Sequence, residues 1–99
     1  MKNLTNVLAE DRRRVILQLL ADDDDYSLND TVLKQALASL GHNTPRDLVH
    51  ADLTWLETHG LVRVQKLGDG DVWVAKLTEA GQDVAGGQPH PGVARPAPR

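Results

Sequence analysis

Apolar residues recur at helical spacing in three stretches of this chain. Each stretch carries a single buried stripe, and this spacing predicts helices over residues 4–21, 26–41 and 45–59. The run of arginines at residues 12–14 is expected largely on the solvated side of the first helix. In chain order, the stripes are Leu4, Leu8, Val15, Ile16, Leu19 and Leu20; Leu33, Leu37 and Leu40; and Val49, Leu53 and Leu56.

Two short segments after residue 60 have a different pattern. "LVRVQKL" and "DVWVAKL" are rich in β-branched and aromatic residues and flank a Gly/Asp turn, which predicts a β-hairpin over residues 61–77. In the second segment Trp73 alternates with Val72 and Val74 and therefore lies on the opposite face of its strand. Thr78 is expected to cap a short final helix in "TEAGQDVA".

The boundary between the second and third helices is marked clearly. Ser27 or Asp30 can cap the second helix, and Gly41 can end it. The third helix is expected to start with Thr44 as its cap and Pro45 at its first position. Two helices joined by a short Gly-containing turn make a helix-turn-helix candidate. The predicted class is therefore α+β, mostly α: a winged helix-turn-helix with three helices, a two-stranded wing and a short C-terminal helix.

The composition fits one domain. The chain has 99 residues, of which 40% are hydrophobic and 25% charged, and a core of this size is not divisible. Residues 4–85 are expected to form the domain. The stretch 86–99, "GGQPHPGVARPAPR", is expected to be disordered because it offers almost nothing to bury.

Several classes of function are disfavoured by the same composition. There is no cysteine and hence no thiolate metal site, and no apolar run approaches the length of a membrane span. A cytoplasmic protein is therefore expected. The histidines match no zinc spacing and the four aspartates at 22–25 lack the pattern of a calcium loop, so no metal or cofactor is predicted. No phosphate-binding loop or nucleophile motif indicates an enzyme.

One region resembles a known family. "LTWLETHGLVRV", a Gly-tipped hairpin and "KLTEAG" are similar to winged helix-turn-helix regulators of the ArsR, MarR and PadR type. In that pattern a Leu-x-x-Leu-Glu recognition helix runs into Gly-Leu-Val, a wing and Leu-Thr-x-x-Gly. The combination "YSLND", "GHNTPRD" and "LTWLETHGLV" also resembles small winged-helix proteins encoded in Mu-like prophages.

The resemblance implies a function and a set of contacts. It implies a homodimeric transcriptional regulator that binds double-stranded DNA. The recognition helix (45–59) would lie in the major groove, and the wing (61–77) would lie along the phosphates. The residues expected towards the groove are Thr44, Arg46, His50, Ala51 and Thr54. Those expected beside phosphates are Arg63, Lys66 and Lys76.

A second hypothesis follows from the charges. The chain carries a net charge of −3, its expected recognition helix is acidic, and the wing tip is Gly68-Asp69-Gly70-Asp71. Carboxylates on a DNA-facing surface cancel the gain from Lys and Arg. The alternative is a protein-interaction or assembly module of phage origin that does not bind DNA strongly.

Overall fold

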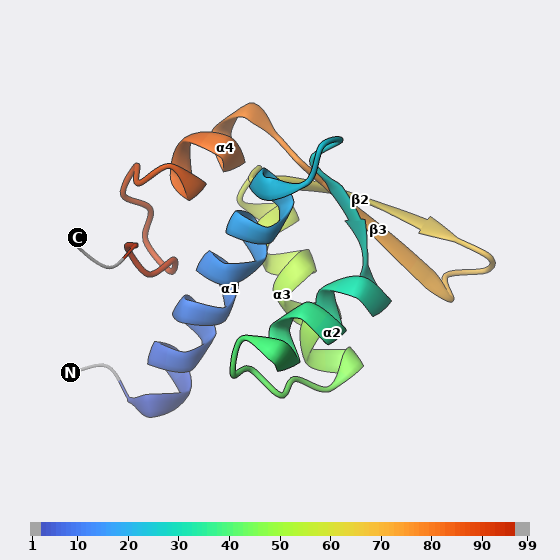
Figure 1. Cartoon of the computed structure of the whole chain (residues 1–99), viewed down its shortest axis with the longest axis horizontal. Coiled ribbons are helices and arrows are strands. Elements are labelled where there is room, and N and C mark those ends of the chain that lie inside the picture. The colour runs from blue at the N-terminus through green and yellow to red at the C-terminus, as the bar shows by residue number, and fades with distance from the viewer. Residues whose placement is uncertain (1–2, 97–99) are drawn as a thin grey trace.

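The computed structural model describes residues 3–96 as four helices and one three-stranded sheet. All three predicted helices, the hairpin and the short last helix are present in this part of the chain, although their ends differ from the predictions. The elements, shown in Figure 1, are α1 (Leu4–Asp22), β1 (Ser27–Asn29), α2 (Asp30–Ser39), α3 (Arg46–Thr58), β2 (Val62–Leu67), β3 (Val72–Leu77) and α4 (Glu79–Ala85).

The predicted fold class is wrong in its sheet. The hairpin is not a two-stranded wing, because β1 pairs antiparallel with β3 and gives the strand order β1-β3-β2. The sequence prediction had placed Ser27–Asn29 in the second helix. Asn29 caps α2 by accepting from the Val32 N–H, so this helix cannot begin earlier. The described part of the chain is therefore an α+β fold of four helices and a three-stranded antiparallel sheet, and a winged helix is not shown.

A turn after α1 creates the additional strand. The side chain of Asp23 accepts from the N–H groups of Asp25 and Ser27, and Tyr26 has a left-handed φ of 58°. The Tyr26 carbonyl then accepts from the Leu77 N–H at 2.8 Å. The acidic run thus ends the helix and turns the chain into the sheet.

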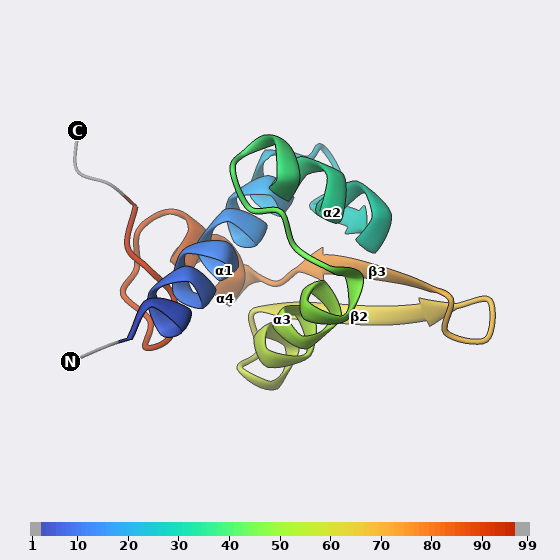
Figure 2. The same cartoon turned by 90° about the horizontal axis from the view of Figure 1, so that it is seen from below.

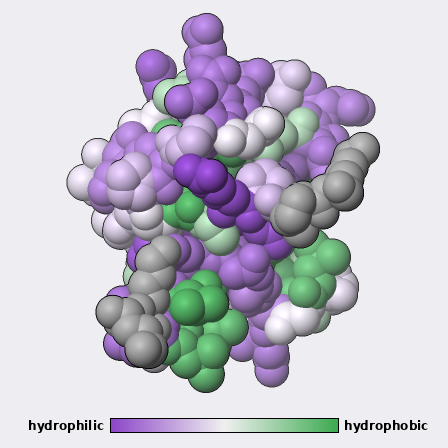
Figure 3. Space-filling model, turned by 90° about the vertical axis from the view of Figure 1, so that its left-hand side faces the viewer, coloured by the Kyte–Doolittle hydropathy of each residue, from purple (hydrophilic) through white to green (hydrophobic). Residues whose placement is uncertain are grey.

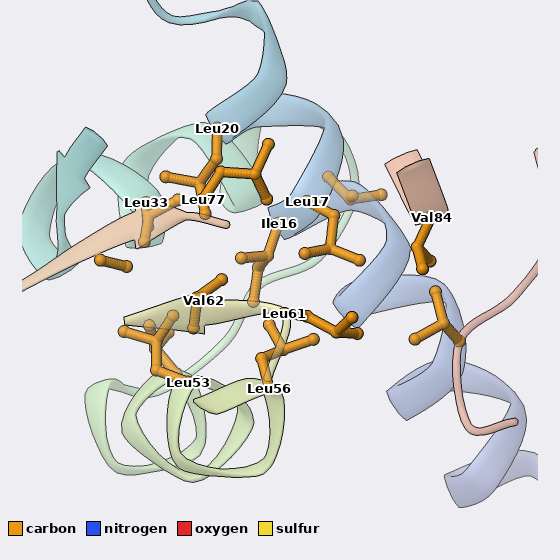
Figure 4. Close-up of a cluster of buried hydrophobic side chains, with 14 of the residues drawn as sticks. Ile16, Leu17, Leu20, Leu33, Leu53, Leu56, Leu61, Val62, Leu77 and Val84 are labelled. Carbon is orange, nitrogen blue, oxygen red and sulfur yellow. The ribbon is translucent and has the colours of Figure 1, made fainter. Parts of the chain in front are cut away.

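The core is aliphatic, as the lack of phenylalanine requires. Leucine, isoleucine and valine side chains from α1, α2, α3 and the sheet meet in one cluster (Figure 4). Ile16, Leu53 and Leu56 are fully buried there. Burial of each such side chain contributes roughly 1.5–3 kcal/mol relative to exposure. One face of the sheet, with Val62 and Leu77, is buried in this cluster, while side chains on the other face, such as Arg63 and Lys76, are exposed.

The start of α3 differs from the prediction. Pro45, not Thr44, is the residue before the first helical turn, and no side chain caps this helix. Thr44 lies one position too early and is only 5% exposed; its hydroxyl donates to the His42 carbonyl at 3.1 Å. The capping role predicted for Thr78 is confirmed, since its hydroxyl accepts from the Gly81 N–H.

A buried ion pair joins α1 to α3, where the pattern predicted solvated arginines. Arg12 is 8% exposed and its guanidinium donates to both carboxylate oxygens of Asp52, which is 3% exposed. Arg13 adds a longer contact, 3.8 Å from its Nε to Asp52 Oδ1. The pattern of apolar residues does not predict the burial of Arg12, because that burial depends on Asp52, a partner on the inward side of α3.

The Gly/Pro-rich segment after α4 has specific contacts over its described part. Residues 86–96 return along α1, where Val93 is 8% exposed and the Ala94 N–H donates to the Glu10 carbonyl at 3.1 Å (Figure 1). Residues 97–99 of the predicted disordered tail lie outside the described residues. Composition alone does not reveal the surface on α1 that holds this segment.

Candidate nucleic-acid interface

The β2–β3 hairpin extends well beyond the helices, and α3 lies beside its base (Figures 1 and 2). Of the predicted groove-facing residues, Ala51 and Thr54 are exposed on α3. Thr44 is buried and does not belong to this surface. The exposed side of α3 therefore reaches solvent through short side chains.

Arg46 and His50 are brought together by Asp30, for which the sequence predicts only a role as a helix cap. His50 Nε2 donates to Asp30 Oδ2 at 2.6 Å, and Arg46 Nη2 lies 3.4 Å from Asp30 Oδ1. Arg46 also donates to the Thr31 hydroxyl at 2.9 Å, yet its side chain remains 46% exposed. Either side chain must leave these partners, at least in part, to contact a base.

The electrostatics of Asp30 favour its ionised form. Burial raises the pKa of this carboxyl, but hydrogen bonds from His50 and from the Trp73 backbone, with the Arg46 charge, outweigh burial and hold the pKa below its ordinary value. The carboxylate is therefore charged at neutral pH and fixes both basic side chains at the start of α3.

Trp73 links this cluster to the hairpin. Its ring stacks on the His50 ring with centroids 3.9 Å apart and planes within 2°. Lys66 Nζ lies 4.3 Å from the Trp73 ring centroid, a cation–π contact. The predicted residues Arg46, His50 and Lys66 thus belong to one connected group that holds the hairpin to α3. The alternation of Trp73 with its neighbours could have indicated the correct face, but not its partner.

Arg63 and Lys76 lie on the other face of the sheet. They are directly opposite each other in the β2–β3 register, and both are exposed. Neither has an ion-pair partner among residues 3–96. Like charges opposite each other on a sheet destabilise it. An anion bound between them would relieve this repulsion, so the pair is suited to phosphate.

One of the three carboxylates of α3 is turned away from its exposed side. Asp52 is neutralised by Arg12 in the interior, whereas Glu57 is exposed and keeps its charge while it accepts from the Val64 N–H at 2.8 Å. Asp47 is the remaining carboxylate of this helix and is exposed. The net charge of the helix sequence therefore overstates the negative charge that a ligand would meet.

Other features of the surface add little. No group of three or more His, Asp or Glu side chains within residues 3–96 is arranged to hold a metal ion. None of the helices in the described chain combines the length and apolar character needed to cross a membrane. Figure 3 shows a mainly hydrophilic face with separate apolar patches; exposed apolar side chains in the chain include Leu4 at 72% and Leu40 at 58%.

Comparison with known proteins gives one relative from a phage and one from a bacterium. No protein-family model matches the chain. It is 41% identical over 97 residues to "Uncharacterized protein gp26" of Escherichia phage Mu, covering 97% of this chain and 98% of that protein. An "Uncharacterized protein" of Haemophilus influenzae is 36% identical over 73 residues, covering 74% of this chain and 70% of that protein.

The class defined by the fold and these matches is a small α+β protein similar to proteins of phage Mu and of Haemophilus influenzae. The chain belongs to the family of phage Mu gp26. The predicted likeness to Mu-like prophage proteins is consistent with this membership, whereas membership of the ArsR, MarR or PadR families is not confirmed.

Proposed function

We propose that this protein binds double-stranded DNA through the exposed side of α3 and the β2–β3 hairpin. The role we infer is that of a homodimeric transcriptional regulator acting in the cytoplasm. The observation that carries the proposal is the distribution of charge. Asp52 is paired with Arg12 in the interior and Glu57 accepts from the Val64 N–H, while Arg63 and Lys76 are exposed without carboxylate partners in the described chain.

Contacts to phosphate would supply most of the affinity. Each neutralised phosphate releases counterions, so the logarithm of the affinity falls with the logarithm of the salt concentration by roughly 0.9 per contact. The two cations on the outer face of the hairpin, Arg63 and Lys76, would give a slope of about −1.8 per protomer; Lys66 lies on the other face, over the Trp73 ring. This corresponds to about a 12-fold loss of affinity between 50 and 200 mM salt, and roughly 150-fold for a dimer with twice the contacts.

Base recognition would be limited. Thr54 and Ala51 can contact base edges, Ala51 through the methyl group of thymine. Arg46 would read guanine only after exchanging its contacts with Asp30 and Thr31, which lowers the net gain. We therefore expect modest sequence discrimination on a mainly electrostatic affinity.

Charge-removal variants test this surface. Arg63→Gln should weaken binding uniformly across sequences and reduce the salt slope by about 1 per protomer. Arg95→Gln is the matched control, because it removes the same charge from the exposed segment at the other end of the chain. Fluorescence anisotropy with a labelled duplex measures both. Equal behaviour of the two variants would exclude the hairpin as the binding surface.

A second candidate function is a protein-interaction or assembly module. It is favoured by exposed apolar side chains on the same elements: Leu67 and Val72 face each other near the hairpin tip, at 43% and 38% exposure, and Leu48 on α3 is 40% exposed. Nucleic acid makes little use of such a surface. Absence of duplex binding at low salt would favour this candidate.

A further inference from the structure

The segment after α4 lies against α1 and α3 and is held there by specific contacts. We call residues 88–96 the strap. Arg13 Nη1 donates to the Gly92 carbonyl at 2.9 Å, and the Ala94 N–H donates to the Glu10 carbonyl at 3.1 Å. Val93, between these two hydrogen bonds, is 8% exposed and joins the core. One backbone acceptor, one backbone donor and one small apolar side chain thus hold the middle of the strap, and the Gln88 N–H fixes its start by donating to the Asp83 carbonyl at 3.0 Å.

The surface beneath the strap is aromatic and cationic. Trp55 stacks on His59 with ring centroids 3.7 Å apart, and Arg13 lies 4.2 Å from the Trp55 centroid. His90 of the strap meets the Trp55 ring edge-on at 5.9 Å. Aromatic-lined grooves of this kind recognise extended proline-containing segments.

Glycine is required where the strap crosses the tryptophan. Gly92 has a left-handed φ of +84°, and a Cβ at this position would lie 2.4 Å from a carbon of the Trp55 ring. Any larger residue would both strain the backbone and collide with the ring. The surface therefore selects a sequence, with glycine over Trp55 and a small apolar residue directly after it.

The strap is held at few points. It curves around an open hollow of about 450 Å³ bounded by Glu10 and residues 89–95. Its glycines and prolines belong to no helix or strand. Segments with few buried contacts open at low free-energy cost relative to global unfolding.

We propose that the surface formed by Glu10, Arg13, Trp55 and His59 is a binding site for extended Gly/Pro-containing peptides of a partner protein, and that the strap is its resident occupant. The partner segment would place a glycine over Trp55, direct its carbonyl to Arg13 and insert a small aliphatic side chain where Val93 lies. A protein partner carrying such a segment displaces the strap.

The direct test uses the wild-type chain and a synthetic peptide with the sequence of residues 88–96. Addition of excess peptide should move the NMR signals of the protein's own strap, such as those of Val93 and Ala94, towards those of a free segment, while the Trp55 indole signal stays near its original position because an identical segment replaces the strap. The same peptide with valine in place of glycine at the Gly92 position should leave the strap signals unchanged. No shift with the first peptide at several millimolar, or equal shifts with both peptides, would overturn the proposal.

A variant of the full chain measures the competition. Gly92→Val should release the strap and bind the labelled wild-type peptide about tenfold more tightly than the wild-type protein does, because a tethered competitor has an effective concentration in the millimolar range. Val93→Asp is the second variant, which releases the strap by charge instead of collision. If circular dichroism shows that either variant is folded and its affinity equals that of the wild type, the strap does not occupy the peptide site.

Discussion

Replacement of Asp52 by alanine should destabilise the protein more than any surface charge change. Asp52 receives two hydrogen bonds from Arg12, and both residues are at least 92% buried, with exposures of 3% and 8%. The substitution would leave the Arg12 guanidinium in the interior without a carboxylate. Arg13, whose Nε lies 3.8 Å from Asp52, would increase the uncompensated positive charge.

The expected loss follows from the burial. Breaking a buried ion pair by removing one partner costs about 3–5 kcal/mol. Total stability for a domain of this size is about 5–15 kcal/mol. With a loss of about 3 kcal/mol and a dependence on urea of about 1.5 kcal/mol per molar, the urea midpoint should fall by about 2 M.

Urea unfolding followed by circular dichroism measures this effect. Asp24→Ala is the control, since Asp24 is exposed in the acidic turn and should change stability by less than about 0.5 kcal/mol. Replacing both partners, Arg12→Met with Asp52→Leu, should restore most of the loss, because no unpaired charge remains. A loss below about 1 kcal/mol for Asp52→Ala would refute the buried pair, since that is the range of exposed ion pairs.

Three further outcomes are expected. Gly81→Ala should destabilise by about 1–3 kcal/mol in urea unfolding, because its Cβ would lie 2.1 Å from the Leu61 carbonyl oxygen, whereas Gly86→Ala, with 3.4 Å to its nearest neighbour, should be nearly neutral. Thr78→Ala should cost ~1 kcal/mol by loss of the α4 cap, measured in the same way. The lowered pKa of Asp30 contributes stability that is present above its unfolded value of about 3.9 and is lost as pH falls through the folded value. Asp30→Asn should therefore flatten the acid-unfolding curve in that window, and an unchanged curve would contradict the assignment.

The sequence predicted the elements better than their assembly. Helical stripes and the β-branched segments identify α1, α3 and the hairpin because burial imposes those periods locally. The strand β1 could not be identified in this way. A strand of three residues is too short to show an alternation of apolar and polar side chains. Its conformation depends on the turn at Asp23 and on pairing with β3, in which Ser27 lies opposite Lys76, nearly fifty residues away in sequence.

The candidate site was predictable in its residue types and not in its arrangement. Arg63 and Lys66 were both expected beside phosphate, but strand alternation puts them on opposite faces of the sheet. Asp30 was read as a cap, whereas its carboxylate binds His50, because α2 and α3 meet there. Long-range pairs between polar side chains leave no periodic signal, so Arg12 with Asp52 was also missed.

The proposal of DNA binding is tested most directly by titrating a labelled random-sequence duplex with the wild-type protein at several salt concentrations. Fluorescence anisotropy should show binding at low salt that weakens with a slope of about −1.8 or steeper. A slope near zero, or no binding at the lowest salt concentration, would contradict the proposed contacts of Arg63 and Lys76 with phosphate.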